Sequence, residues 1–158
     1  MPVTVTEVLL WLFIIVLGTA FGAGLYEARV VVPLWASAPP VSLRSPESGH
    51  RFWVFVTTIP LTLLTLANLA AAWQAQGPRR AWWLTATLVV LVERGATFGY
   101  FIPTMLRLQR DPTLGEMPVR AGLARWARLN YLRNCMTLIA WIAALKVLSM
   151  AYAILPLR

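Results

Sequence analysis

The sequence has almost none of the residues that bind transition metals or form disulfide bonds. Among its 158 residues there is one cysteine, Cys135, and one histidine, His50. A single cysteine excludes an internal disulfide bond. One histidine and one cysteine cannot form a His/Cys zinc site or a dicopper centre, and the acidic residues are not clustered as a di-iron site requires. We expect no metal and no cofactor, although a haem held by one histidine stays open.

Charged residues are also scarce, at 13% of the chain, compared with about 25% in soluble domains. Hydrophobic residues make up 59%, and the mean hydropathy is +0.67. The eight tryptophans fit a membrane protein, because indole rings settle at the interface between lipid and water. This composition excludes an ordinary soluble domain and predicts an integral membrane protein.

The formal net charge of +8 comes almost entirely from arginine, since only one of the fourteen cationic residues is a lysine. Most of these arginines lie in the connections between apolar runs, where they set membrane topology and contact anionic lipid headgroups. No basic block is interleaved with stacking aromatic residues. We therefore expect membrane lipids as partners and no nucleic acid; the oligomeric state stays undetermined.

Four apolar runs are each long enough for the roughly 20 residues that a bilayer requires. They predict one membrane domain over residues 1–158, an all-α four-helix bundle with antiparallel, up-and-down spans. Pro33 and then Ala38-Pro39-Pro40 should end the regular structure after the first span, and Pro60 should kink the second span. The last span should begin with a segment that lies along the headgroups. The predicted spans are about 7–30, 52–74, 81–106 and 120–155.

The distribution of arginine predicts the orientation of these spans. The first and third loops carry most of the arginines, and the short second loop has only Arg79 and Arg80. Loops rich in arginine stay in the cytoplasm. The sequence thus predicts a multi-pass protein of the cell membrane with loops 1 and 3 in the cytoplasm.

Polar side chains recur on one face of the fourth span. Trp126, Asn130, Arg133 and Thr137 follow helical spacing at the point where this helix enters the membrane. This pattern predicts a polar pocket there, which the other helices close.

Further polar residues fall at the same end of the predicted bundle. Glu27 ends the first span and His50 begins the second, while Glu93, Thr97 and Tyr100 share a face of the third. A carboxylate such as Glu93 is costly within a membrane and rarely faces lipid. We expect these groups to line one cavity that opens toward the cytoplasmic leaflet. The alternative is an ion pair of Glu93 with Arg94 or Arg133 that serves structure alone.

Three segments of the chain resemble the anthrone oxygenase-like family of small four-helix membrane proteins. They are LYEARVVVPLW in the first span, ATFGYFIPTMLRL in the third and RWARLNYLRNCMTLIAW in the fourth. The sharpest element is Trp126-x3-Asn130-x2-Arg133. The family often has a histidine where this chain has Tyr131, so the family's base does not carry over to that position.

The resemblance implies a cofactor-independent oxygenase that acts on a flat, hydrophobic anthrone-like polyketide. Loss of a methylene proton gives an enolate that reacts with dioxygen, which requires a base and donors for the enolate oxygen. The base is assigned to Glu93, with His50 and Glu27 as further candidates. The remaining roles are enolate stabilisation by Arg133 and Asn130, and substrate binding by Trp126, Tyr100, Thr97, Glu27 and Thr137.

Two other function classes remain open from the sequence. A non-catalytic membrane protein that binds lipid or a partner predicts that the polar groups pair among themselves around no cavity. A small proton-coupled transporter predicts a carboxylate with access to both sides of the bilayer. A cavity that contacts Glu93 and Arg133 would favour the enzyme.

Overall fold

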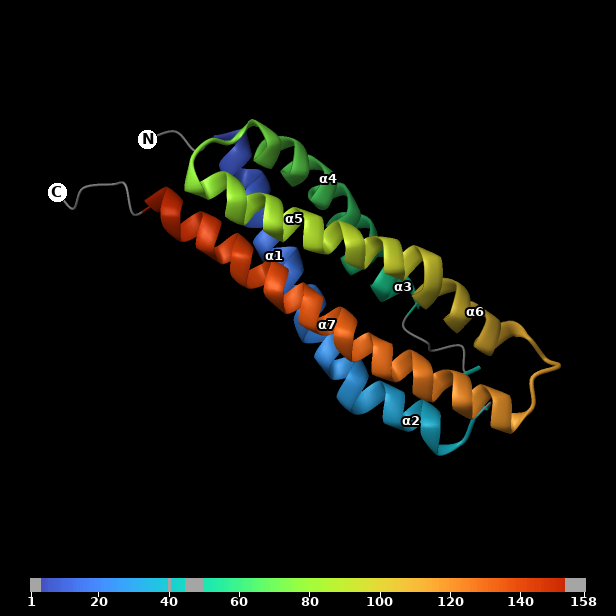
Figure 1. Ribbon diagram of the computed structural model, residues 1–158. Helices are drawn as coiled ribbons and strands as arrows, with labels where there is room; N and C mark the ends of the chain where they lie inside the picture. The colour runs from blue at the N-terminus through green and yellow to red at the C-terminus, as the bar shows by residue number, and fades with distance from the viewer. Residues whose placement is uncertain (1–3, 40, 45–49, 153–158) are drawn as a thin grey trace.

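The computed structural model describes residues 4–39, 41–44 and 50–152, and these form helices and no strand. The predicted all-α four-helix membrane bundle is confirmed (Figure 1). In chain order the elements are α1 (Val5–Tyr26), η1 (Glu27–Val31), α2 (Val32–Ser37), α3 (His50–Phe52), η2 (Trp53–Thr58), α4 (Ile59–Gln74), α5 (Pro78–Ala96), η3 (Thr97–Phe101), α6 (Ile102–Arg110) and α7 (Glu116–Tyr152).

These elements join into four continuous helical runs that are long and apolar enough to cross a membrane: Val5–Ser37, Trp53–Gln74, Pro78–Arg110 and Glu116–Tyr152. Adjacent runs are antiparallel, and α1 and α7 reach the same end of the bundle as the α4–α5 turn (Figure 1). The protein is a small multi-pass membrane protein.

Local sequence sets the ends of several helices. Thr4 caps α1, where its hydroxyl oxygen accepts a hydrogen bond from the backbone N–H of Glu7. Gly77 has φ 68°, a conformation that glycine adopts at little cost, and Pro78 then starts α5. The second and third spans therefore turn back on one another within three residues, 75–77.

The four helices form a closed ring in the half of the bundle nearest the α4–α5 turn. There α1 packs against α4 and α7, and α5 packs against α4 and α7. Leucine and alanine side chains fill the centre of this ring around Phe13 and Trp83. Asn68 lies within it, donating to the carbonyls of Leu9 and Leu64 and accepting from the Trp83 indole. This half of the bundle is therefore closely packed, and the Asn68 amide within it has hydrogen-bond partners.

The other half of the bundle is built differently, because three spans contain a π-helical segment there. Each segment ends two residues before a proline: η1 before Pro33, η2 before Pro60 and η3 before Pro103. Proline has no N–H and its ring clashes with the carbonyl four residues earlier. A π turn widens the helix at that point, and the residue before each proline bonds to the carbonyl five residues back.

Pro33 does not end the first helix, because the π turn lets the helix continue; it ends at Ser37, directly before Ala38, where the second of the two expected breaks begins. Pro60 likewise lies within a helix that widens on its N-terminal side. Segments of this kind are frequent at functional sites. All three lie in the half of the bundle that carries the buried charges.

The arginine-rich end is closed by contacts between the first and third loops. The Arg44 guanidinium donates to the carbonyl of Asp111 over 2.7 Å, and Leu43 is fully buried beside Leu108 and Val119. The hydroxyl and backbone N–H of Thr113 both donate to the Asp111 carboxylate, which lowers the pKa of Asp111.

Candidate active site

Four charged side chains from three spans, three of them buried and Arg133 nearly so, meet in the half of the bundle with the π-helical segments. Glu93 and Arg94 form one pair within the third span, with 2.6 Å between Arg94 Nε and Glu93 Oε2 and 2.7 Å between Arg94 Nη2 and Glu93 Oε1. Thr97 also donates to Glu93 over 3.1 Å. The Glu93 carboxylate is 2% exposed, and both of its oxygens are already hydrogen-bonded.

Glu27, in η1, faces the fourth span and is much less engaged. Its only hydrogen-bond donor among the described residues is the Asn130 side-chain amide, at 3.2 Å from Oε2. Arg133 Nη2 lies 3.5 Å from the same oxygen. Glu27 is 5% exposed and Asn130 is fully buried, so this carboxylate has few partners in a poorly hydrated site.

The Arg133 guanidinium lies between the two carboxylates without bonding closely to either. Its Nε is 3.9 Å from Glu93 Oε1, and its Cζ lies 4.8 Å from the centre of the Phe101 ring. It makes no hydrogen bond to any other side chain or carbonyl within residues 4–39, 41–44 and 50–152. A guanidinium has five N–H donors, so Arg133 can donate to a ligand.

A cavity of about 120 Å³ lies against this arginine and Glu27. Its wall is rich in aromatic side chains, including Trp126, whose indole N–H donates to the Phe101 carbonyl. The rings of Trp35 and Phe101 both pack edge-on against Trp126. The lining residues are Glu27, Trp35, Trp53, Val54, Thr58, Thr97, Phe101, Ile102, Met105, Leu106, Gln109, Trp126 and Arg133.

A second, smaller cavity of about 30 Å³ lies deeper and is lined by Glu93, Arg94 and Asn134. Trp53, Thr58, Thr97 and Arg133 line both cavities. A space of this size is large enough for one or two water molecules. The tightly hydrogen-bonded pair of Glu93 and Arg94 therefore lies at the small polar cavity. The loosely paired Glu27 and Arg133 lie at the larger aromatic cavity.

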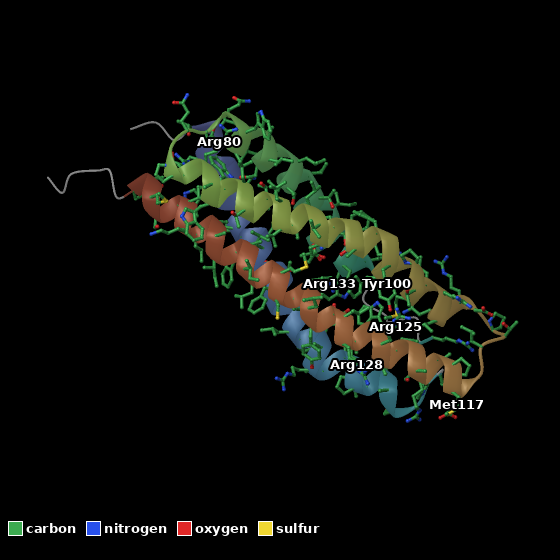
Figure 2. All side chains as sticks on the ribbon, viewed as in Figure 1. Arg80, Tyr100, Met117, Arg125, Arg128 and Arg133 are labelled. Carbon is green, nitrogen blue, oxygen red and sulfur yellow. The ribbon has the colours of Figure 1, made fainter. Side chains whose placement is uncertain are left out.

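The structure brings most of the residues predicted for the site together. Glu93, Thr97, Asn130, Arg133 and Thr137 lie around the charges with Glu27 and Trp126, and the Thr137 hydroxyl donates to the Arg133 carbonyl. Figure 2 shows Arg133 between the two ends of the bundle that Arg80 and Met117 mark.

Two predicted residues are placed differently. Tyr100 is half-buried and packs its ring against Phe101, and it is not among the residues that line the two cavities described above. His50 begins α3, but its side chain lies outside what the structure describes. The assignment of His50 as a base stays a prediction.

Sequence reasoning missed several residues that form the site. Asn134 is 5% exposed, and its Nδ2 has no hydrogen-bond partner among the described residues. It lies four residues after Asn130, so helical spacing could have found it. Trp35, Trp53 and Phe101 line the cavity, but a sequence does not distinguish them from aromatic residues at the lipid interface.

The fold and the site together define a class: a multi-pass membrane protein with a buried charge cluster beside an aromatic cavity. Comparison with models of protein families, with curated proteins and with solved structures found no match.

Proposed function

We propose that this protein is a cofactor-independent oxygenase of the membrane that acts on a flat, hydrophobic, anthrone-like substrate. The observation that carries the proposal is the position of Glu27 and Arg133. These opposite charges lie 3.5 Å apart in the wall of one aromatic cavity, and neither is saturated by hydrogen bonds. The three segments that resemble anthrone oxygenase-like proteins support the same activity.

The geometry favours Glu27 as the base rather than Glu93. Glu93 is held by both donors of Arg94 and by Thr97, so taking up a proton there would break strong hydrogen bonds. Glu27 has one amide donor and lines the larger cavity. In this assignment Glu93 and Arg94 hold the third span in register beside Arg133.

The reaction follows from these roles. Glu27 removes a proton from the methylene carbon of the substrate, and the electron pair of the C–H bond moves onto the neighbouring carbonyl as an enolate. Arg133 donates to the enolate oxygen, which stabilises the charge as it develops. The amide of Asn130 holds the carboxylate in place through its bond to Glu27.

Dioxygen is the oxidant, and no other reductant or oxidant is required. The enolate carbon transfers electrons to dioxygen and forms a C–O bond, and a proton completes a hydroperoxide. Loss of the second proton from that carbon then breaks the O–O bond, leaving a quinone carbonyl and one molecule of water. The sum is anthrone plus dioxygen to anthraquinone plus water.

Aromatic walls suit a flat substrate. Trp126 forms edge-to-face pairs with Phe101 and Trp35 in the cavity wall, with ring centres 5.7 and 6.5 Å apart, and Trp53 of the second span also lines the cavity. Such rings contact a flat ligand over a large area at little cost in conformational entropy. We also propose that this end of the bundle faces the cytoplasm, since loops 1 and 3 carry most of the arginines.

A second function has one observation in its favour. The bidentate pair of Glu93 and Arg94 is what a purely structural charge network would contain. That function predicts no cavity beside the charges, whereas one of about 120 Å³ is present. Transport by alternating access has less support, because the half of the bundle beyond the charges is filled by Leu10, Phe13 and Leu17.

The test is oxidation of an anthrone by the purified protein in detergent. Quinone formation is followed by absorbance and dioxygen consumption by an electrode, both against the spontaneous rate without protein. We expect a rate above that background, and a loss of about 10²-fold or more in Glu27→Gln and in Arg133→Gln, because each removes one group that acts on the reacting atoms.

Glu7→Gln is the matched control for the Glu27 variant. Glu7 lies at the opposite end of the same helical run, where it accepts a hydrogen bond from Tyr152. We expect this variant to retain wild-type activity. No rate above background with several anthrones would refute the oxygenase, and full activity in Glu27→Gln would refute the role of that carboxylate.

A further inference from the structure

We propose that the cavity takes in the single-ring phenol or quinol head of a membrane amphiphile, sideways from the lipid between the second and third spans. The hydrocarbon tail of this ligand would stay in the bilayer. The inference rests on the proposed function, in that Glu27 and Arg133 are the groups that meet the substrate.

The opening of the cavity is located by the exposure of the residues that line it. Its residues from the first and fourth spans are buried or nearly so: Glu27, Trp35 and Trp126 are at most 9% exposed, and the Arg133 side chain is 13% exposed. Seven of the lining residues from the second and third spans are partly exposed, whereas Arg133 is the one partly exposed lining residue from the other two spans; the seven are Trp53, Val54, Thr58, Ile102, Met105, Leu106 and Gln109. The mouth therefore lies between these two spans.

The packing of the second and third spans agrees with a mouth at this level. Their close contact is between α4 and α5, next to the turn that joins them. At the other end, residues of both η2 and α6 line the cavity. The mouth is bordered by Val54, Ile102 and Leu106, which suit a hydrocarbon chain.

The depth of the cavity follows from helix geometry. A helix rises 1.5 Å per residue, so about 20 residues cross the hydrocarbon core. Trp82 and Trp83, at the start of the third span, mark one boundary of the hydrocarbon core. The opposite boundary is about 20 residues further along this span, near Ile102. The cavity is lined by residues of this span from Thr97 to Gln109. Its mouth thus lies at the border of hydrocarbon and headgroups, where amphiphiles place their polar ends.

The volume decides how much of a ligand is enclosed. A protein cavity of about 150 Å³ holds one benzene ring, and pockets for drug-sized ligands measure about 300–1,000 Å³. The cavity here measures about 120 Å³. It encloses about one ring, so the second and third rings of an anthrone would have to occupy the mouth.

The polar wall fits the hydroxyl group of a phenol. A phenol oxygen donates one hydrogen bond and accepts others. The Glu27 carboxylate accepts, and the Arg133 guanidinium has donors that make no hydrogen bond within the described chain. Both groups lie in the cavity wall, so one hydroxyl can bond to both.

The test measures equilibrium binding of labelled 4-nonylphenol to the full chain in lipid nanodiscs, after subtraction of protein-free nanodiscs. Ligand concentration is expressed per mole of lipid, so that partitioning into the bilayer does not count as binding. We expect saturable binding of the same strength for 4-pentylphenol, because the tail stays in lipid. Anthrone should compete about tenfold less well, because its extra rings overpack the mouth.

Two matched variants test the mouth itself. Leu106→Trp fills the opening and should weaken binding of 4-nonylphenol about tenfold. Leu63→Trp places the same side chain on a lipid-facing site of α4, where Leu63 is 63% exposed, and should leave binding unchanged.

Tighter competition by anthrone than by 4-nonylphenol would overturn the inference, and so would equal binding by the two variants. These failures are distinct from failure of the proposed function. If the protein oxidises anthrone but does not bind 4-nonylphenol, the proposed oxygenase activity stands and the phenol ligand class is refuted. If the protein binds 4-nonylphenol but oxidises no substrate, the proposed binding site stands and the oxygenase activity is refuted.

Discussion

Replacing Glu93 with alanine leaves the Arg94 guanidinium without a partner in the interior of the bundle. The pair is bidentate, its two contacts measure 2.6 and 2.7 Å, and the side chains are 2% and 9% exposed. Removing one partner of a buried ion pair costs about 3–5 kcal/mol, because the other charge stays buried. We expect Glu93→Ala to lower the free energy of unfolding by about that amount.

The double variant Glu93→Leu/Arg94→Met should recover most of this loss. Replacing both charges with apolar side chains of similar volume is often neutral, since no charge then remains buried. Arg133 keeps its neighbour Glu27 at 3.5 Å in this variant. The assay is unfolding of the purified protein in mixed detergent micelles, followed by circular dichroism, as a double-mutant cycle over the two single variants and the double variant.

The exposed pair of Glu116 and Arg120 provides the control. Its atoms are 2.9 Å apart, but the side chains are 59% and 54% exposed. Exposed pairs contribute about 0–1 kcal/mol, so Glu116→Ala should have little effect on unfolding. The reasoning fails if Glu93→Ala is as mild as Glu116→Ala, or if the double variant loses the sum of the two single losses.

Two further predictions concern helix packing and use the same unfolding assay. Gly24→Ala should destabilise the protein by about 1–3 kcal/mol, because a Cβ there would overlap the Asn134 side chain. Gly22→Ala is the control and should be near neutral, because a Cβ there meets open space. Equal losses in the two variants would contradict this prediction. Asn68→Leu should cost about 0.6–2 kcal/mol, because it leaves the Trp83 indole N–H without its acceptor; a gain in stability would contradict this.

The spans and the polar face of the fourth helix could be predicted from the sequence because both depend on local patterns. Apolar runs of sufficient length indicate membrane helices, and helical spacing groups Trp126, Asn130 and Thr137, which are all buried in the structure. The same spacing extends to Asn134.

The difference in hydrogen bonding between the two carboxylates was not predictable in this way. It depends on which guanidinium reaches which oxygen: Arg94 bonds to Glu93, and Arg133 lies closer to Glu27 than to Glu93. The Arg133 distances depend on how separate spans pack, and the Arg94 distance depends on the side-chain conformations of two neighbouring residues. Spacing along one helix carries no information about them.

The π-helical segments were also beyond the sequence pattern. A proline within an apolar run predicts that the helix ends or kinks. At Pro33, Pro60 and Pro103 the helix instead widens by one residue per turn and continues, which shifts the face that each span presents to the cavity. Packing against the neighbouring spans decides between these outcomes.

Cysteine accessibility at Thr58 tests the central claim most directly, that the four spans leave a cavity beside Arg133 that small polar molecules can enter. Thr58 lines both cavities, and Thr62 lies one turn further along the second span and lines neither. In a Cys135→Ala background, Thr58→Cys should react with a water-soluble methanethiosulfonate at least about tenfold faster than Thr62→Cys, because the reactive thiolate forms only where water reaches it. Equally slow reaction at both positions would contradict the account.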